Sequence, residues 1–530
     1  MPASEKAIVD EEKQAGVVAF LSGADAYGAG AAPETVETHV SRVFLLPDRA
    51  YKLKRAVKFP YLDFSDPAAR LAACEDEVEI NRRTAPDIYL GVEPIRRAGG
   101  GAFALGAGSG EIVDWVVVMR RFDETGLLDN MAKAGKLDRR MMYAVADAIA
   151  AFHADAEPLS KRGGWAGTRL IVENNAESFA RASAGVLDAD RVAALNESSL
   201  ALVEALAAKL DARRDQGCVR HCHGDLHLRN IYVVEGRPML FDAIEFNRDF
   251  ADIDVLYDLA FLLMDLECRG LGRLASFVFN RYFDVTGALA ATPAAVSVLN
   301  LFLALRAAVR AHVDASQSAM LSDPARRRRR AEEAASYLEL ALKFLAPSPP
   351  RLVAVGGLSG SGKSRMSREL ACHVGAAPGA RVVRTDVVRK RLFGVGPEVR
   401  LPDEAYNAEA HRRTYEAFMA ELKEGLAQGH AVIADGVFAG PRQRDAVRAL
   451  AAEMGVPFAG LWVTAPPEVL AERVAKRQFD ASDATVDVLG EQLTWDLGRI
   501  DWTEVSSDGE KAATLARGLA ALGMGAAADK

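Results

Sequence analysis

One stretch of the sequence combines acidic and amide side chains at a spacing suited to phosphoryl transfer. The segment HCHGDLHLRNIYVVEGRPMLFDAIEFN contains Asp225 and Asn230 in a polar loop, and Asp242 at the end of the second of two strand-like pieces. In a loop of this order, one carboxylate meets the acceptor hydroxyl, and the amide and a second carboxylate bind Mg²⁺. Mg²⁺ prefers such hard oxygen ligands. The pattern therefore predicts a base at Asp225 and metal ligands at Asn230 and Asp242.

The sequence HGDLHLRN resembles the HGDxxxxN loop of the aminoglycoside phosphotransferase and choline kinase-like superfamily, whose members have a protein kinase-like fold. The resemblance covers roughly residues 37–344. It implies that Asp225 orients or deprotonates the acceptor hydroxyl and that His223 braces the loop. It also assigns Asn230 and Asp242 to Mg²⁺.

The lysine that meets the α and β phosphates in such kinases is expected upstream, in RAYKLKRAV. Ala50 and Lys52 share one strand face and match the spacing of the VAIK pattern. We therefore predict Lys52 as the phosphate lysine. Lys54 lies on the same face and remains the alternative, because a period of two does not separate them.

Two further residues complete the predicted nucleotide site of the first part. Glu77, on a polar helix from about Pro67 to Arg83, is the predicted ion-pair partner of the lysine, in preference to Glu75 and Glu79. Ser41 opens a strand where these kinases have their phosphate loop, and we predict that it contacts phosphate although a GxGxxG is missing.

A second phosphate site is predicted by GGLSGSGKS, which follows the strand-like RLVAV and opens a helical segment. Its core satisfies GxxxxGK[ST], a Walker A loop whose backbone N–H groups surround phosphate at a helix N-terminus. Lys363 would reach the β and γ phosphates and Ser364 would bind Mg²⁺. The predicted nucleotide-binding residues are Gly357, Ser359, Gly360, Ser361, Gly362, Lys363 and Ser364.

The segment from about Arg351 to Arg517 is similar to the small P-loop kinases, a group that includes gluconate kinase, adenylate kinase-like enzymes, chloramphenicol phosphotransferase and the zeta toxins. Asp386 and Arg389 match the DxxR that this group uses on the acceptor side. A carboxylate there can meet the acceptor hydroxyl, and a guanidinium can meet an anionic or polar group. A helix N-cap is the alternative role of Asp386.

Three more residues of the second part have predicted roles by this resemblance. Asp435 ends a strand at the Walker B position and would hold Mg²⁺ through water. Arg473 and Arg477 lie four residues apart on one predicted helix face, where these kinases carry lid arginines that neutralise charge on the transferred phosphoryl group. Surface ion pairing is the alternative for both arginines.

The elements that position these residues fall on either side of a helix-breaking APSPPR. Before it, short β-branched segments precede apolar residues at helical spacing, and after it strands and helices alternate. We predict an α/β and α+β multidomain chain, a protein kinase-like two-lobed domain followed by a P-loop NTPase domain with a parallel sheet. The predicted boundaries are 1–345 (N-lobe about 30–120, C-lobe about 121–345), a Pro-rich linker at 346–350 and a P-loop kinase domain at 351–530.

Composition limits the partners. With 50% hydrophobic and 26% charged residues the chain matches ordinary globular proteins, so disorder is excluded. A net charge of −8 provides no overall positive field, so nucleic acid and membrane partners are not expected.

The 5 cysteines are too few and scattered for a disulfide framework, and the N-terminus lacks the pattern of a secretory signal. We therefore expect a cytoplasmic location. The sequence does not define the oligomeric state.

Both halves together resemble the bacterial proteins called bifunctional aminoglycoside phosphotransferase/ATP-binding proteins. The resemblance implies a kinase with two ATP sites, each transferring the γ-phosphoryl group of Mg·ATP to a hydroxyl of a small-molecule acceptor. One alternative is a single N-terminal kinase regulated by a C-terminal P-loop ATPase, and another is a nucleotide-sensing signalling module. Neither acceptor is identified; Arg306 and Arg310 suit either an anionic acceptor or interior salt bridges.

Overall fold

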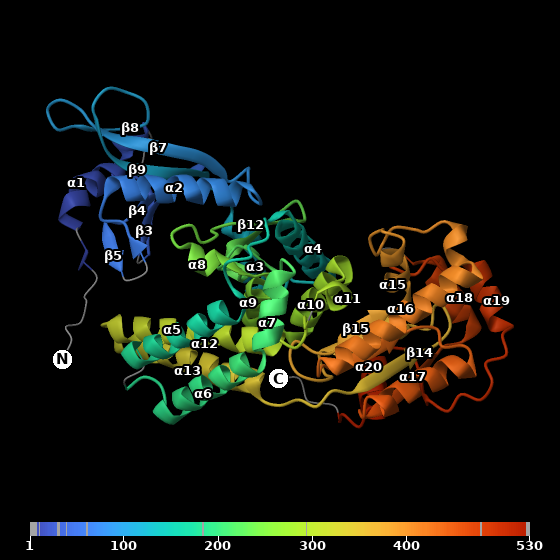
Figure 1. Ribbon diagram of the computed structural model, residues 1–530. Coiled ribbons are helices and arrows are strands. Elements are labelled where there is room, and N and C mark those ends of the chain that lie inside the picture. The colour runs from blue at the N-terminus through green and yellow to red at the C-terminus, as the bar shows by residue number, and fades with distance from the viewer. Residues whose placement is uncertain are drawn as a thin grey trace. The chain divides into compact units, whose positions relative to one another are not determined.

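The computed structural model describes residues 8–9, 11–28, 32–38, 40–59, 62–182, 185–292, 294–477 and 480–525 (Figure 1). The chain divides into two compact units. The first unit comprises Met1–Leu137, Ala151–Pro158 and Arg220–Ile253, and the second comprises Asp138–Ala150, Leu159–Val219 and Asp254–Lys530. Within the described residues, no helix is both long and apolar enough to cross a membrane.

The first unit is built on an antiparallel sheet of six strands in the order β2-β3-β4-β9-β7-β8. Its strands are β2 (Glu34–Glu37), β3 (Ser41–Leu45), β4 (Arg49–Lys54), β7 (Tyr89–Arg97), β8 (Phe103–Leu105) and β9 (Glu111–Arg120). Short strands β1 (Ile8–Val9), β5 (Val57–Phe59) and β6 (Leu62–Asp63) form a separate small sheet.

Two helices cover opposite faces of the six-stranded sheet, α1 (Glu11–Leu21) and α2 (Pro67–Arg82). Tyr51 and Leu53 of β4 join a buried cluster with Val17 of α1. Because side chains along a strand alternate between the two faces of the sheet, Lys52 and Lys54 lie on the face covered by α2. The N-cap of α2 is Asp66, whose carboxylate accepts a hydrogen bond from Ala68 N (2.9 Å).

The remaining elements of the first unit carry the predicted catalytic loop. The hairpin of β11 (Ile231–Val234) and β12 (Arg237–Leu240) follows a 3₁₀ turn at Leu228–Asn230. The other elements here are η2 (Glu124–Gly126), α3 (Leu128–Lys133) and α8 (Arg248–Ala251). Strands β10 (Val219–His221) and β13 (Asp252–Asp254), and helix α4 (Arg139–Asp155), span the boundary between the units.

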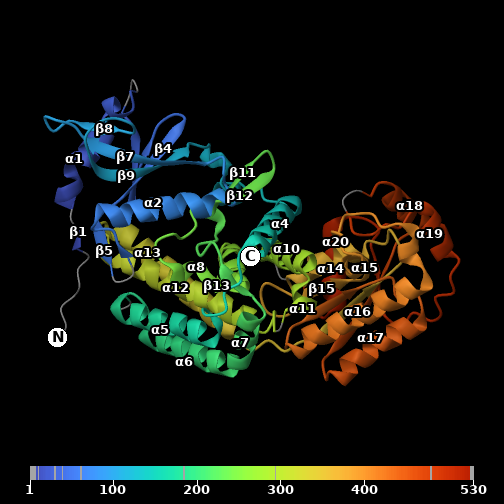
Figure 2. The ribbon, with the colours of Figure 1, turned by 45° about the horizontal axis from the view of Figure 1, so that its top comes forward.

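The second unit combines a group of helices with a parallel sheet. The helices before residue 346 are α5 (Gly164–Ala182), α6 (Ala189–Ala205), α7 (Ala207–Asp215), α9 (Val255–Cys268), α10 (Gly272–Thr286), α11 (Ala288–Ala291), α12 (Leu299–Met320) and α13 (Pro324–Leu345). The last two lie side by side in Figures 1 and 2. Arg306 of α12 lies 3.8 Å from Asp258, and Arg310 lies 3.2 Å from Asp314. Both arginines thus form interior salt bridges.

The parallel sheet has five strands in the order β15-β16-β14-β17-β18. They are β14 (Leu352–Gly356), β15 (Arg381–Arg384), β16 (Val432–Asp435), β17 (Phe458–Thr464) and β18 (Thr503–Ser506). The connecting helices are α14 (Lys363–Ala371), α15 (Thr385–Leu392), α16 (Ala408–Ala427), α17 (Pro441–Glu453), α18 (Pro467–Ala475), α19 (Val486–Leu493) and α20 (Lys511–Ala521). The predicted parallel sheet is confirmed.

Apolar side chains attach helices to both faces of this sheet. Val353 and Val355 of β14 share a buried cluster with Leu370 of α14, and residues of α20 pack against that cluster. Val432 faces the opposite side, where a Cβ built on Gly425 of α16 would lie 2.7 Å from it. The sheet is thus a buried middle layer, as βαβ crossovers require.

Helix α10 covers the edge of this sheet at β15. The Asn280 side chain accepts a hydrogen bond from Val382 N (2.8 Å) and donates one to Ala380 O (3.2 Å). Arg381 donates to Asp284 (2.6 Å). One side chain of α10 thereby satisfies backbone groups that an edge strand otherwise leaves unpaired. These buried contacts join residues that precede and follow the 346–350 segment. The predicted domain boundaries stay a prediction.

Candidate active sites

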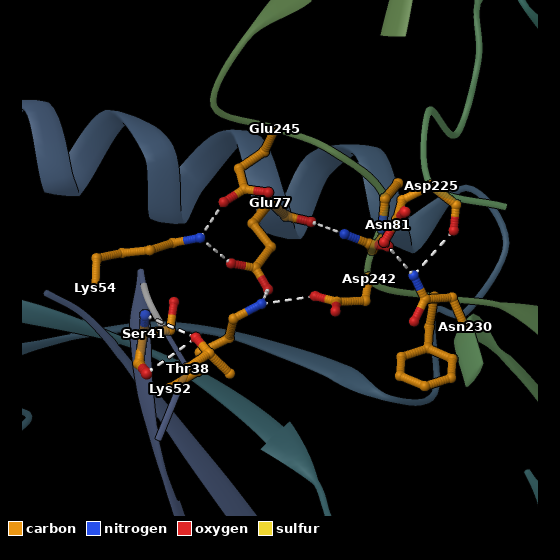
Figure 3. Close-up of polar contacts among 12 residues, drawn as sticks. Thr38, Ser41, Lys52, Lys54, Glu77, Asn81, Asp225, Asn230, Asp242 and Glu245 are labelled. Carbon is orange, nitrogen blue, oxygen red and sulfur yellow. Dashed lines mark hydrogen bonds and ion pairs between the residues drawn. The ribbon is translucent and has the colours of Figure 1, made fainter. Parts of the chain in front are cut away.

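The two lysines of β4 and a glutamate of α2 form the centre of the first site (Figure 3). Lys52 Nζ lies 2.8 Å from Glu77 Oε1 and 2.6 Å from Asp242 Oδ1. Lys54 Nζ lies 2.5 Å from Glu77 Oε2 and also contacts Glu245. Glu77 thus bridges both lysines, and Lys52 alone of the two contacts the predicted metal aspartate.

The charges of this cluster hold one another in the ionised state. Burial by itself favours the neutral form of Glu77, but Lys52 and Lys54 outweigh that effect and lower its pKa to about 2. Burial also acts against the charge of Lys52. Asp242 and Glu77 overcome it and raise the pKa of Lys52 well above its ordinary value. The lysine is therefore cationic, as a phosphate contact requires.

The predicted catalytic loop is held by its own side chains. Asn230 Nδ2 donates to Asp225 Oδ2 (2.9 Å) and to Asp225 O (3.0 Å). His223 Nε2 lies 2.9 Å from Phe241 O, and Asp225 N donates to His223 Nδ1 (3.3 Å). His223 therefore links the loop to Phe241, the residue before Asp242, and its predicted bracing role stays a prediction. The Asp225 side chain is 37% exposed, which leaves it accessible to an acceptor.

Ser41 lies in β3 opposite Lys54 in the strand ladder. Its side chain is 1% exposed, and its amide donates to Thr38 Oγ1 (3.0 Å). The hydroxyl has no hydrogen-bond partner among the described residues. The phosphate contact predicted for Ser41 stays a prediction.

The sequence-based prediction missed several residues that secure the first site. Glu245 is buried and contacts Lys54, while Asn81 accepts a hydrogen bond from Ala243 N (2.9 Å). The hydroxyl of Tyr89 accepts a hydrogen bond from Asp242 N (3.1 Å). In the sequence, Glu245 could be noticed because it is acidic and lies three positions after Asp242.

The second site is formed by main chain. Gly357, Gly360 and Gly362 of the Walker A loop have φ values of 144°, 83° and 91°, which other residues rarely adopt. A Cβ on Gly360 would lie 2.5 Å from Leu470 O. Ser359 N donates to Gln492 Oε1 (2.8 Å), and Ser361 O accepts from Ser507 Oγ (2.6 Å). These contacts thus fix the conformation of the loop before Lys363 begins α14.

Asp435 lies at the end of β16, beside the start of α14. Its carboxylate accepts a hydrogen bond from Arg384 Nε (3.2 Å). Burial raises the pKa of Asp435, and Arg384 opposes that rise. Ser364 also acts to lower the pKa of Asp435, so these two predicted oxygen ligands are near each other. Their binding of Mg²⁺ stays a prediction.

The predicted acceptor pair is on α15. Asp386 is in the first turn of this helix, whose N-cap is Arg384, so an N-cap role for Asp386 is excluded. Arg389 donates to Ala405 O (2.8 Å) and lies 3.0 Å from His411 Nδ1. No hydrogen bond joins Asp386 and Arg389 within the described ranges, and their acceptor roles remain a prediction.

The predicted lid arginines occupy different environments. Arg473 of α18 donates to Ser507 Oγ (2.8 Å) and Ser507 O (2.9 Å), next to the Walker A loop. The prediction that Arg477 shares its helix face is wrong, because α18 ends at Ala475. Arg477 instead lines a cavity of about 360 Å³ with Arg400 and Asp480.

Family models agree with this division into two sites. The model described as "Phosphotransferase enzyme family" matches residues 58–296, and the model described as "AAA domain" matches residues 352–495. The chain is therefore a kinase, with a phosphotransferase domain of kinase-like fold and a C-terminal P-loop kinase domain. The predicted fold class and the predicted enzyme class are confirmed.

Curated proteins are similar to the chain over most of its length or over a part of it. The chain is 31% identical over 478 residues to uncharacterized protein Rv2004c of Mycobacterium tuberculosis, covering 88% of this chain and 91% of that protein. The same values hold for uncharacterized protein Mb2027c of Mycobacterium bovis. The chain belongs to the family of these proteins. Over 123 residues it is 36% identical to adenylyl-sulfate kinase of Myxococcus xanthus, covering 23% of this chain and 60% of that enzyme.

Solved structures are similar to the chain over a part of its length. An aminoglycoside phosphotransferase APH(4)-Ia mutant is 16% identical and covers 61% of this chain and 98% of its own, with a TM-score of 0.35. A gluconokinase from Sinorhizobium meliloti is 24% identical and covers 34% of this chain and 94% of its own, with a TM-score of 0.24.

Proposed function

We propose that the protein has two nucleotide sites, each of which transfers the γ-phosphoryl group of Mg·ATP to a hydroxyl of a small-molecule acceptor. The observation that supports this proposal is that each unit has a lysine near a carboxylate, at the positions where the sequence predicts phosphate and Mg²⁺ contacts. Lys52 lies 2.6 Å from Asp242 in the first unit, and Lys363 opens α14 beside Asp435 in the second. Each pair contains the cation and the carboxylate that phosphoryl transfer requires.

Mg²⁺ suits the donors of both sites. Asp242 and Asn230 supply a carboxylate and an amide, and Asp435 and Ser364 supply a carboxylate and a hydroxyl. The Asp242 side chain is 45% exposed, so it remains open to a metal and to nucleotide. When bound, Mg²⁺ neutralises charge on the β and γ phosphates. Lys52 and Lys363 would bind phosphate oxygens, and Asp225 would accept the proton of the acceptor hydroxyl in the first site.

The acceptors proposed here are small molecules, and a cytoplasmic location without nucleic acid or membrane partners is part of the proposal. In the second site, Asp386 and Arg389 would receive the acceptor, and Arg473 and Arg477 would neutralise the transferred group. Similarity to an enzyme named adenylyl-sulfate kinase supports transfer by this half to a small molecule.

The test uses the full-length chain with the second site inactivated by Lys363→Ala. Transfer of label from γ-labelled ATP to the small molecules of a metabolite extract is measured with and without Asp225→Asn. A positioned base contributes roughly 10² to 10⁴ in rate, so label transfer should fall by that factor while a non-hydrolysable ATP analogue still binds. Unchanged transfer would show that Asp225 has no part in the reaction.

A further inference from the structure

The first site contains a second buried lysine, Lys54, beside Lys52. The side chain of Lys54 is 1% exposed, and its ammonium group lies between Glu77 and Glu245. Burying an ammonium group is costly unless carboxylates surround it. Because Glu77 gives one oxygen to each lysine, its position relative to Lys52 is fixed from two sides.

The segment around the metal aspartate is attached to α2 and to the turn that follows this helix. Thr84 Oγ1 donates to Leu240 O (2.6 Å), and Asn81 Oδ1 accepts from Ala243 N (2.9 Å). Asn81 is fully buried and also donates to Glu77 O (2.8 Å), so one amide joins the segment to the helix turn that carries Glu77. Glu245 adds an ionic contact through Lys54.

Asp242 itself needs such support. Its φ of 60° is in the left-handed region, which is unfavourable for a non-glycine residue. Tyr89 accepts a hydrogen bond from the Asp242 amide, and Asn81 accepts from the next amide. Contacts on both sides of Asp242 therefore maintain a conformation that an isolated loop would leave.

These contacts hold together groups whose assembly controls activity in many kinases. Activity there requires the ion pair of lysine and helix glutamate and the metal aspartate to be in place together, and activation segments regulate that assembly. Here the chain continues from Asp242 directly into AIEFN, and the loop and helix are joined by buried groups (Figure 3).

We propose that Lys54, Glu245 and Asn81 are positioning residues that lock the metal-binding loop to α2, so that Lys52 and Asp242 are assembled before nucleotide binds. This inference rests on the proposed function of the first site. It assigns a constitutively assembled site to this kinase, and it gives Lys54 a role different from phosphate binding.

The experiment compares Lys54→Met with the double variant Lys54→Met/Glu245→Leu in the Lys363→Ala full-length background. The single change leaves Glu245 buried without its partner, whereas the double change replaces the pair by apolar groups, a replacement that is often neutral for stability. Lys58→Met is the matched control, because Lys58 pairs with Asp63 in the same unit but is 55% exposed.

Two readouts are taken. Hydrogen exchange of the Asp242 and Ala243 amides, without nucleotide, reports whether the loop remains attached to α2. ADP formation from Mg·ATP with a metabolite extract gives kcat and the KM for ATP. We expect the double variant to keep the thermal midpoint of the parent, to exchange these two amides at least tenfold faster, and to lose about 10- to 100-fold in kcat with little change in KM.

A double variant that recovers slow exchange and full kcat together with its stability would overturn the proposal, since the pair would then serve folding alone. If the single variant does not fold, the double variant still tests the positioning role of Lys54 and Glu245. Absence of ADP formation above the Asp225→Asn level in the parent would refute the proposed function, while the exchange measurement would still test the positioning role. Lys58→Met should leave both readouts unchanged.

Discussion

The two candidate phosphate sites of this chain are built differently. In the first unit, Lys52 is held by carboxylates from α2 and from the segment after β12. In the second unit, Lys363 forms no ion pair within the described part of the chain, and the surrounding loop presents glycine backbone. A site made of side chains from separate segments depends on tertiary packing, whereas a site made of one loop depends on local conformation.

The largest effect is expected from removing Lys363, the cation of the second site, whose phosphate-binding residues lie in one loop. Charge-assisted hydrogen bonds contribute about 1.5 to 3 kcal/mol, so Lys363→Ala should weaken nucleotide binding at the second site by about 10- to 100-fold. Calorimetric titration with a non-hydrolysable ATP analogue should then count one tight site per chain instead of two. Lys423→Ala, at an exposed lysine paired with Glu453, is the control and should keep both sites.

The contrast between the sites also explains what the sequence could predict. The Walker A loop and its lysine were predicted because strand, loop and helix are contiguous. Lys52 and Lys54 could not be separated, since both lie on one face of β4, and it is the contact of Lys52 with Asp242 that distinguishes them. Glu245 was missed because its partner is 191 residues away in the sequence.

The positions of helix ends were a second feature that could not be predicted from the sequence. The periodicity that placed Arg477 on a helix with Arg473 could not show where α18 ends, because helix termini depend on tertiary contacts as much as on propensity. The strands of the parallel sheet were predicted more successfully, since their apolar runs are buried on both faces.

A smaller change should disturb the second site alone. Gly360→Ala places a Cβ 2.5 Å from Leu470 O at a φ of 83°. Left-handed strain costs roughly 1 to 2 kcal/mol, so nucleotide affinity at the second site should fall about tenfold while the first site is unaffected. Gly429→Ala has a similar φ of 80° with nothing within 4 Å, and should leave both affinities unchanged.

The second unit should also lose stability in acid. Burial lowers the pKa of His430 to about 4, below its unfolded value of about 6.5. Its stabilising contribution is therefore complete above pH 6.5 and is lost as the pH falls toward 4, by about 2 kcal/mol at pH 5. Denaturant unfolding at pH 8 and pH 5 should show this loss, and His430→Gln should reduce it. An identical pH dependence in the variant would refute the assignment.

The smallest effect is expected at the sheet edge under α10. Asn280→Ala leaves Val382 N and Ala380 O without their partner, at a cost of about 1 to 2 kcal/mol. The unfolding free energy should fall by that amount, and Asn280→Asp, which keeps an acceptor for Val382 N, should recover part of it. Equal stability of all three proteins would show that the edge does not need this side chain.

Independence of the two sites tests the central claim most directly. ADP formation from Mg·ATP with a metabolite extract is measured for the full-length chain, Asp225→Asn, Lys363→Ala and the double variant. Because each site has its own lysine and metal carboxylate, each single variant should lose only its own share, so that the two residual rates sum to the wild-type rate within about twofold and the double variant is inactive. Collapse of the whole activity in either single variant would contradict two independent sites and would indicate that one nucleotide site controls the other.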